Sequence, residues 1–241
     1  EPRYELTTGL SSLIGISNIY LAKNSFDYFG DSSILNPFVN TWSLGVALQF
    51  YLIVPILFYF TIGFRGKRAK KILIFIISLL VILSLYLFVF FYSEKFAFTY
   101  FMLPTRFWEI GIGILSYFIF IKKYLFKNQN LDDFLSPAIF SGICFIIIYL
   151  NNNPVLATLS TVVLTGFLLV FLDDLSEFGK IFSLLTLRHI GKLSYHIYLW
   201  NGGILSISRH TIGIHWWSIP IQVILIYFFS RISYFYTTNR I

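Results

Sequence analysis

Residues 72–92 read ILIFIISLLVILSLYLFVFFY, a run of 21 residues without a charged side chain. A helix needs about 20 apolar residues to cross the hydrocarbon core of a bilayer, so this run is long enough to span one. Just before it, residues 65–71 read RGKRAKK, with five positive charges and no acid. Because short cytoplasmic loops are enriched in Lys and Arg, the run predicts a transmembrane helix that begins at the cytoplasmic face.

The composition of the 241 residues extends this interpretation to the whole chain. Hydrophobic residues make up 57% and charged residues only 12%, against about 25% charged in soluble domains. This excludes a water-soluble globule. The apolar runs are rich in Leu, Ile and Phe without an alternating pattern, which favours helices over an outer-membrane barrel. The net charge of +7 arises from basic residues at the ends of apolar runs, so it indicates contact with membrane lipid rather than a nucleic-acid partner.

We therefore predict an all-α fold, a polytopic transmembrane helical bundle. Seven stretches are suitable as spans: 44–64, 72–92, 101–121, 135–150, 154–172, 190–208 and 216–235. The positive-inside rule places the loops around 65–71 and 122–127 in the cytoplasm. Alternation then places 93–105 and 151–154 outside, and 173–189 inside.

The first 43 residues form an external segment in this prediction. The stretch 10–22 is apolar but short and contains Ser and Asn, so we expect a helix lying on the outer surface. If it crossed the membrane instead, the number of spans would be eight and Glu1 would be cytoplasmic. The stretch 23–41 has the turn residues of a loop. The predicted organisation is thus an external segment over 1–43, a transmembrane bundle over 44–236 and a cytoplasmic tail over 237–241.

Polar side chains inside the spans are the natural candidates for function, because each one is costly in lipid. Arg106 and Glu109 lie three residues apart on one helix face, where they can form a structural ion pair or serve a substrate. The nearby Gly111 and Gly113 have no side-chain bulk, so a neighbouring helix is expected to approach closely.

Two further spans carry polar candidates. Trp42 enters the first span at the level of the membrane interface. Gln49, one or two turns further in, must bond to another helix or to substrate, and the sequence leaves both open. Near the end, Tyr198 shares a helix face with Asn201, whereas His196 points elsewhere, in line with Trp200. The predicted polar seam consists of Gln49, Arg106, Glu109 and Tyr198.

Other chemistry has little support in the residue pattern. No His has a second His or a carboxylate at the spacing of metal ligands, so we expect no metal site. Cys144 stands alone in an apolar run and is expected to be a small buried hydrophobe. A channel is disfavoured because no ring of charged residues recurs across the spans.

Several strings, in this order, resemble the integral-membrane acyltransferase family 3, bacterial O-acyltransferases that modify cell-surface and secreted sugars. They are SNIYL at 17–21, DYF at 27–29, LNPFVNTWSLGVALQFYLIVP at 35–55, TRFWEIGIG at 105–113 and IGKLSYHIYLWNGG at 190–203. The likeness extends from residue 1 to about residue 236.

The resemblance implies about ten helices in a complete member, of which about seven are present here. It implies a multi-pass protein of the bacterial inner membrane that takes an acyl group, expected to be acetyl, from acyl-CoA (acetyl-CoA). The acceptor would be a carbohydrate. The family's catalytic His and Arg-rich motif would precede Glu1, so the catalytic residues are unknown and we expect an N-terminally incomplete chain, inactive alone. Candidates for lining or supporting the substrate channel are Trp42, Gln49, Arg106, Glu109, Tyr195 and Tyr198.

The chain also departs from the family pattern at five positions where the family has His or an acid. They are Asn40, Ala47, Leu48, Asn201 and Thr238. Each change removes an ionisable group that moves protons or orients a substrate. A second hypothesis is therefore a degenerate homologue that binds or transports a lipid-linked sugar without catalysis.

Overall fold

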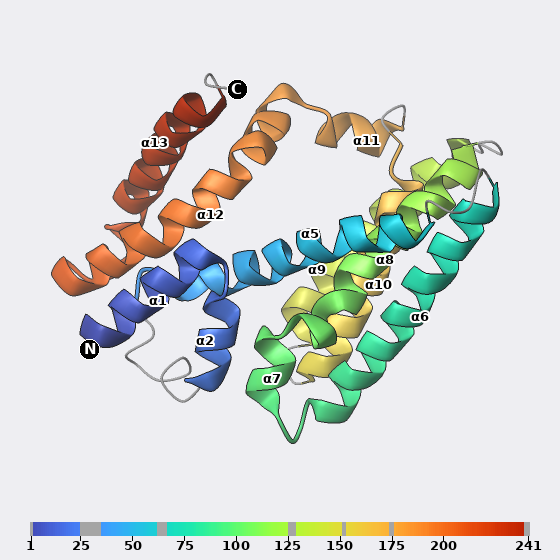
Figure 1. The fold of residues 1–241 in the computed structure, drawn as a ribbon. Helices are drawn as coiled ribbons and strands as arrows, with labels where there is room; N and C mark the ends of the chain where they lie inside the picture. The colour runs from blue at the N-terminus through green and yellow to red at the C-terminus, as the bar shows by residue number, and fades with distance from the viewer. Residues whose placement is uncertain are drawn as a thin grey trace. The chain divides into compact units, whose positions relative to one another are not determined.

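The computed structural model describes residues 2–24, 35–61, 67–124, 129–150, 153–173 and 176–238. Within these ranges every regular element is a helix (Figure 1), which confirms the predicted all-α class. The chain divides into two compact units, residues 1–51 with 186–241, and residues 52–185. Parts of the predicted loops lie outside the described residues, namely 25–34, 62–66, 125–128, 151–152, 174–175 and the tail residues 239–241.

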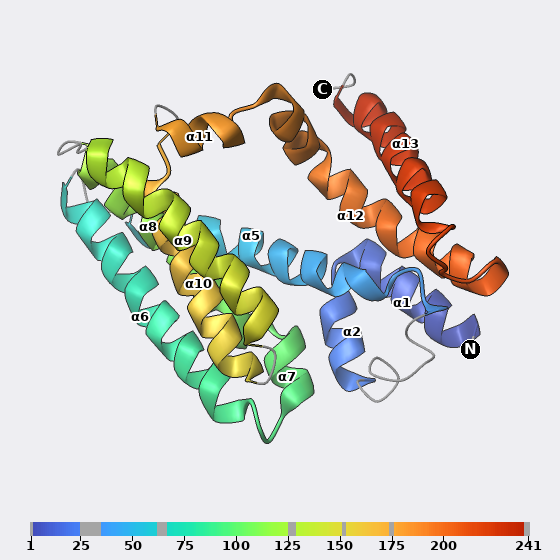
Figure 2. The same cartoon turned by 180° about the vertical axis from the view of Figure 1, so that it is seen from behind.

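The unit formed by residues 52–185 is a helical bundle. Its long helices are α6 (Lys67–Phe91), α8 (Leu103–Tyr124), α9 (Gln129–Tyr149) and α10 (Pro154–Phe171). Helix α8 packs between α6 and α10, and α10 also packs on α9, as the two opposite views in Figures 1 and 2 show. Two short helices that the sequence did not predict lie within expected loops, α7 (Phe96–Phe101) and α11 (Glu177–Phe182).

Helix α6 shows why this bundle suits a membrane. One face is buried in the bundle, at Leu73, Ile77, Val81, Ser84 and Phe88. The other face is exposed and equally apolar, at Phe75, Leu79, Ile82, Tyr86 and Phe90. A helix that is hydrophobic all round requires an apolar environment outside the protein as well as inside it. Hydrocarbon supplies that environment.

Glycines set the close packing around α8. A Cβ added at Gly111 would lie 2.3 Å from Cγ2 of Val81 on α6. A Cβ at Gly166 of α10 would lie 2.7 Å from Cγ2 of Ile112. The expected close approach is therefore confirmed at Gly111, but it is wrong at Gly113, where an added Cβ would have no described neighbour within 4 Å.

The other unit begins with α1 (Pro2–Ile14) and α2 (Ser17–Lys23). The prediction of a single helix over 10–22 is wrong, because Gly15 adopts φ +77 and ends α1. The Ile16 N–H donates to the Ser11 carbonyl over 2.9 Å, which closes the helix end as left-handed C-terminal glycines commonly do. With 13 and 7 residues, neither helix reaches the length that a span requires.

Helix α5 (Trp42–Thr61) follows the short 3-10 helix η1 (Val39–Thr41) and contributes to both units, which divide between Tyr51 and Leu52. Pro55 lies inside α5. Because proline has no N–H to donate to the Tyr51 carbonyl four residues earlier, the helix lacks a backbone hydrogen bond where the two units divide.

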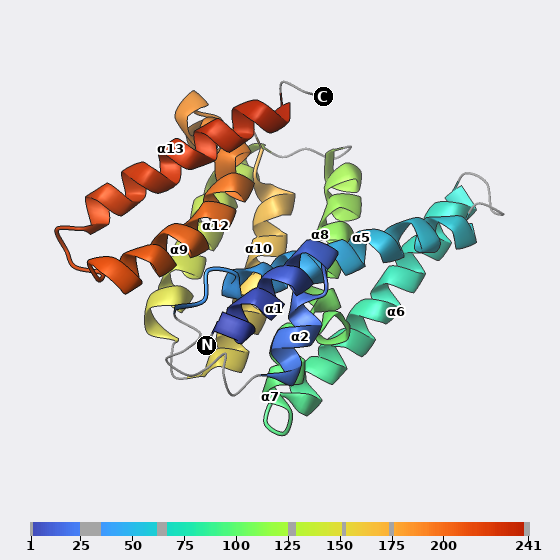
Figure 3. The same cartoon turned by 60° about the vertical axis from the view of Figure 1, so that its left-hand side comes forward.

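Helices α12 (Leu185–Thr211) and α13 (Ile219–Thr238) run side by side in opposite directions (Figures 1 and 3). The indole N–H of Trp200 donates to Ser233 Oγ over 2.8 Å, and His196 Nε2 lies 3.2 Å from Thr237 Oγ1. The prediction that His196 and Trp200 share a face is confirmed. Helix α13 extends to Thr238, two residues beyond the predicted end of the bundle at 236.

Among the described residues, five helices are long and apolar enough to cross a membrane: Val39–Tyr59, Arg68–Phe91, Asp132–Tyr149, Pro154–Phe171 and Ile219–Thr238. They correspond to five of the seven predicted spans. The other two are α8 and α12, with 22 and 27 residues. Both are long enough to span, but they carry more polar residues, including Arg106 with Glu109 on α8 and Lys192 with His196 on α12.

The glycine contacts predict how two similar substitutions differ. Gly113→Ala is expected to leave the free energy of unfolding unchanged or raise it by up to about 1 kcal/mol, through helix propensity. Gly111→Ala forces its Cβ into Val81, so we expect it to be about 1–3 kcal/mol less stable than Gly113→Ala. Unfolding of both variants in detergent micelles measures the difference. Equal stabilities would contradict the packing at Gly111.

Candidate functional site

The unit of residues 1–51 and 186–241 contains a cavity of about 660 Å³. Its walls come from α1, η1, the first turns of α5 and the middle of α12. The lining residues are Leu6, Gly9, Leu10, Ser12, Leu13, Phe38, Thr41, Leu44, Ala47, Leu48, Tyr51, Tyr195 and Leu199. The lining is mostly apolar, which is usual for small-molecule sites that fix orientation with a few polar groups.

Four hydroxyl groups supply the polarity of this cavity. Ser12 Oγ and Thr41 Oγ1 lie 2.5 Å apart and join α1 to η1. Tyr51 and Tyr195 line the cavity from α5 and α12, with 67% and 54% of each residue exposed. These groups donate and accept hydrogen bonds, and the described lining includes no acid, Lys, Arg or His.

The chain just before α5 forms part of this cavity, and α1 and α2 hold it in place. Asn36 Nδ2 donates to Thr8 Oγ1 over 3.0 Å, and both residues are buried. Ser17 Oγ donates to the Thr41 carbonyl over 2.9 Å. Side chains thus satisfy backbone and hydroxyl groups that would otherwise be costly to bury.

Tyr198 of α12 also bonds to the chain around the start of α5. Its hydroxyl lies 2.7 Å from Ser43 Oγ and also donates to the Asn40 carbonyl. Asn40 is one of the positions at which the chain departs from the family pattern. Its backbone accepts the Tyr198 hydroxyl, so this contact does not depend on the side chain at position 40.

Two more residues of α12, four and eight positions after Tyr198, contact the chain before α5. Ser206 Oγ donates to the Leu35 carbonyl. Between Tyr198 and Ser206, a Cβ added at Gly202 would lie 2.7 Å from the Pro37 carbonyl oxygen. Only glycine fits there, so one face of α12 is matched in shape and in hydrogen bonding to residues 35–40.

Gln49 bonds to a helix of the same unit. Its Nε2 donates to Asn18 Oδ1 over 2.9 Å, and Asn18 Nδ2 donates back to Gln49 Oε1 over 3.3 Å. Asn18 is fully buried. Of the two roles that the sequence left open, the structure shows the bond to another helix, which joins α2 to α5.

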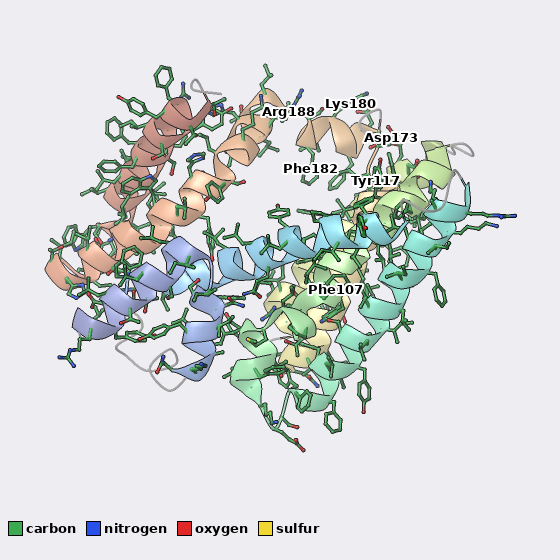
Figure 4. The ribbon with its side chains drawn as sticks, in the orientation of Figure 1. Phe107, Tyr117, Asp173, Lys180, Phe182 and Arg188 are labelled. Carbon is green, nitrogen blue, oxygen red and sulfur yellow. The ribbon has the colours of Figure 1, made fainter. Side chains whose placement is uncertain are left out.

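Arg106 and Glu109 form the expected ion pair on α8, with Nη1 and Oε1 2.8 Å apart. Arg106 Nε also donates to the Tyr100 carbonyl over 3.0 Å, and the guanidinium stacks 4.9 Å from the Tyr100 ring centroid. Both charged side chains are mostly buried, at 18% and 25% exposed. Figure 4 labels Phe107, the buried neighbour of Arg106 on α8.

The six candidate residues therefore fall into two groups. Tyr195 lines the cavity, whereas Gln49 and Tyr198 bond to the elements that form it. Trp42, half-buried, begins α5 in the same unit. Arg106 and Glu109 belong to the other unit, so the predicted seam of Gln49, Arg106, Glu109 and Tyr198 stays a prediction.

Sequence reasoning missed the polar partners contributed by the first two helices. Thr8, Ser12 and Asn18 each bond to a residue of the segment 36–49. The one available signal was the presence of Ser and Asn in an otherwise apolar stretch. Alone, such residues are as compatible with a water-facing surface as with buried hydrogen bonds.

Comparison with known proteins relates this architecture to a family of enzymes. A family model described as an acyltransferase domain matches residues 6–235. The chain is 27% identical, over 96% of its length, to the "Putative peptidoglycan O-acetyltransferase YrhL" of Bacillus subtilis. It is 26% identical, over 80% of its length, to the O-acetyltransferase OatA of Staphylococcus aureus.

These matches cover 39% of the first relative and 33% of the second, so the chain spans between a third and two fifths of the length of the curated relatives it matches. No solved structure matches the chain. The family model nevertheless covers nearly all of the 241 residues. The chain therefore belongs to the acyltransferase 3 family of multi-pass membrane proteins.

Proposed function

We propose that the chain is part of a bacterial plasma-membrane enzyme that transfers an acetyl group from acetyl-CoA to a hydroxyl of a cell-wall or exported sugar. The observation that carries this proposal is the family match over residues 6–235. The names of the relatives, O-acetyltransferases and in one case a peptidoglycan O-acetyltransferase, favour acetyl as the group and a wall sugar as the acceptor.

Acyl transfer of this kind makes two demands on a site. A sugar hydroxyl attacks the thioester carbonyl, the new C–O bond forms, and the C–S bond to CoA breaks. A base must take the hydroxyl proton, and hydrogen-bond donors must stabilise the oxyanion that develops. In this proposal the base lies outside these 241 residues, in the family's His and Arg-rich segment.

Arg106 is the candidate donor in the bundle of residues 52–185. Glu109 and the Tyr100 carbonyl and ring hold its guanidinium in one orientation. A donor that is already oriented stabilises a developing oxyanion without the cost of reorganisation.

The cavity has a different role in this proposal. Its apolar wall excludes water, while the Tyr195 hydroxyl and the Ser12–Thr41 pair supply hydrogen bonds for a substrate.

Activity is expected of the longer parent and not of these 241 residues by themselves. Expression of the parent gene in a strain without wall O-acetylation should add base-labile acetate to the wall. The purified 241-residue chain should transfer no radiolabelled acetyl from acetyl-CoA, because the proposed base is missing. Incorporation of label by the chain alone would refute the proposal that the base lies outside these 241 residues. A parent protein that adds no acetate to the wall would refute the proposed reaction.

The cavity can be tested with two substitutions of one kind in α5. Ala47→Phe places a ring into the cavity, and we expect it to lower wall acetate at least tenfold in the full-length parent. Leu52→Phe is the matched control, because Leu52 is 72% exposed and does not line the cavity. Membrane levels of both variants must equal those of the parent. Undiminished acetate with Ala47→Phe would remove the cavity from the reaction.

One observation favours a second candidate, a homologue that binds a lipid-linked sugar without catalysis. Ala47 and Leu48 stand where the family pattern has two acids, and both line the cavity. The cavity wall is therefore apolar where relatives would carry charge, which suits a lipid chain. The codons upstream of Glu1 separate the two candidates, since an intact His and Arg-rich segment favours the enzyme and a corrupted one favours the binder.

A further inference from the structure

The last part of the chain has an unusual charge distribution. Residues 178–241 contain six Lys and Arg, all four His of the protein, and no Asp or Glu. The stretch includes most of α11 and the whole of α12 and α13, and α12 and α13 pair through Trp200 and Ser233. A cation on α12 or α13 therefore has no acid on either of these two helices as a partner.

Arg231 is the cation that most needs such a partner. It is on α13, which is long and apolar enough to span a membrane. Its Nη1 donates to His189 Nε2 over 2.9 Å and contacts the Tyr227 hydroxyl at 3.5 Å. Neither of these residues is an acid, and within the described residues no carboxylate pairs with Arg231. A charged group in an apolar helix is costly unless an opposite charge compensates it.

Two more cations flank the residue that Arg231 contacts. Arg188 directly precedes His189, and Lys192 follows it by about one turn of α12. Figure 4 shows Arg188 near the start of this helix. Both side chains are exposed, and because they are four residues apart on one face they repel each other. An anion bound between them would attract both cations and so offset their mutual repulsion.

The surface around these cations is apolar. Leu187 and Ile190 of α12 are 42% and 46% exposed, and Phe228 and Ile232 of α13 are 55% and 37% exposed. A small hydrophilic anion would leave these side chains in water. A ligand that joins an anionic head to an acyl chain would contact both the cations and the apolar side chains. Basic sites of this type between membrane helices bind anionic lipid headgroups.

We propose that Arg231, Arg188 and Lys192 form a binding site for the phosphate group of an amphipathic ligand, an anionic phospholipid or an acyl-CoA. Arg231 supplies a planar fork that matches two phosphate oxygens, and the other two cations supply charge from α12. Binding of a phospholipid requires only that the two helices fold and pair, whereas binding of an acyl-CoA at this site would rest on the proposed acetyl transfer.

The test uses the full 241-residue chain in a neutral detergent. Phosphatidylglycerol and phosphatidylcholine are titrated separately, and bound lipid is counted by native mass spectrometry. We expect phosphatidylglycerol to bind more tightly. Arg188→Gln and Lys192→Gln should each weaken it about fivefold, the effect of one cation near a membrane surface. Arg231→Lys should also weaken it although it keeps the charge, because lysine lacks the fork.

Arg209→Gln is the matched control, because it removes the same charge from the opposite end of α12. It should leave phosphatidylglycerol binding within twofold. Equal weakening by Arg209→Gln, or no weakening by Arg188→Gln and Lys192→Gln, would overturn the proposal. The two exposed positions on α12 keep the test valid even if changes at Arg231 disturb the contact with His189.

A competition experiment identifies the source of the phosphate. Palmitoyl-CoA or CoA is added to the chain with bound phosphatidylglycerol. If CoA alone displaces the lipid, the site recognises the phosphates of the acyl donor. If only palmitoyl-CoA displaces it, the site requires an attached acyl chain, and if neither does, it is specific for the phospholipid headgroup. Each of these outcomes supports the phosphate site if the Arg188→Gln variant binds the ligand more weakly, and the proposal is overturned if that variant binds as tightly as the unmodified chain.

Discussion

A polar group that is buried in the protein must find a hydrogen-bond or charge partner there, and this constraint explains several of the contacts that join the helices. It explains why Gln49 and Asn18 exchange two hydrogen bonds and why Arg106 is held by both Glu109 and Tyr100. Apolar packing makes the helices adhere without selecting a unique arrangement. The polar contacts select which helix faces meet.

The most extensive set of such contacts surrounds residues 35–43. Hydrogen bonds reach this segment from α1, α2 and α12, so elements from both ends of the chain hold it. The cavity beside it is a consequence of this arrangement, because α1, η1 and α12 are kept around the first turns of α5. Residues 35–43 therefore link α1, α2 and α12 of their unit to one another.

The departures from the family pattern take on a structural meaning in this setting. Ala47 and Leu48 stand where the family resemblance implies two acids, and both line the cavity, so the binder hypothesis rests on an apolar wall at these positions. Asn40, by contrast, takes part through its backbone carbonyl, which any residue would supply. Loss of an ionisable side chain thus affects the cavity lining at positions 47 and 48, whereas at position 40 the hydrogen bond from Tyr198 is kept.

The sequence by itself determined the helical class, the approximate bounds of the long helices and the Arg106–Glu109 pair, because hydrophobic length and helical spacing are local properties. It did not reveal that α1 ends at Gly15, that α7 and α11 are short helices, or which residue bonds to Gln49. Only the tertiary structure decided those. A hydrogen bond between residues 31 positions apart, as between Asn18 and Gln49, depends on which helices meet, and no local pattern records that choice.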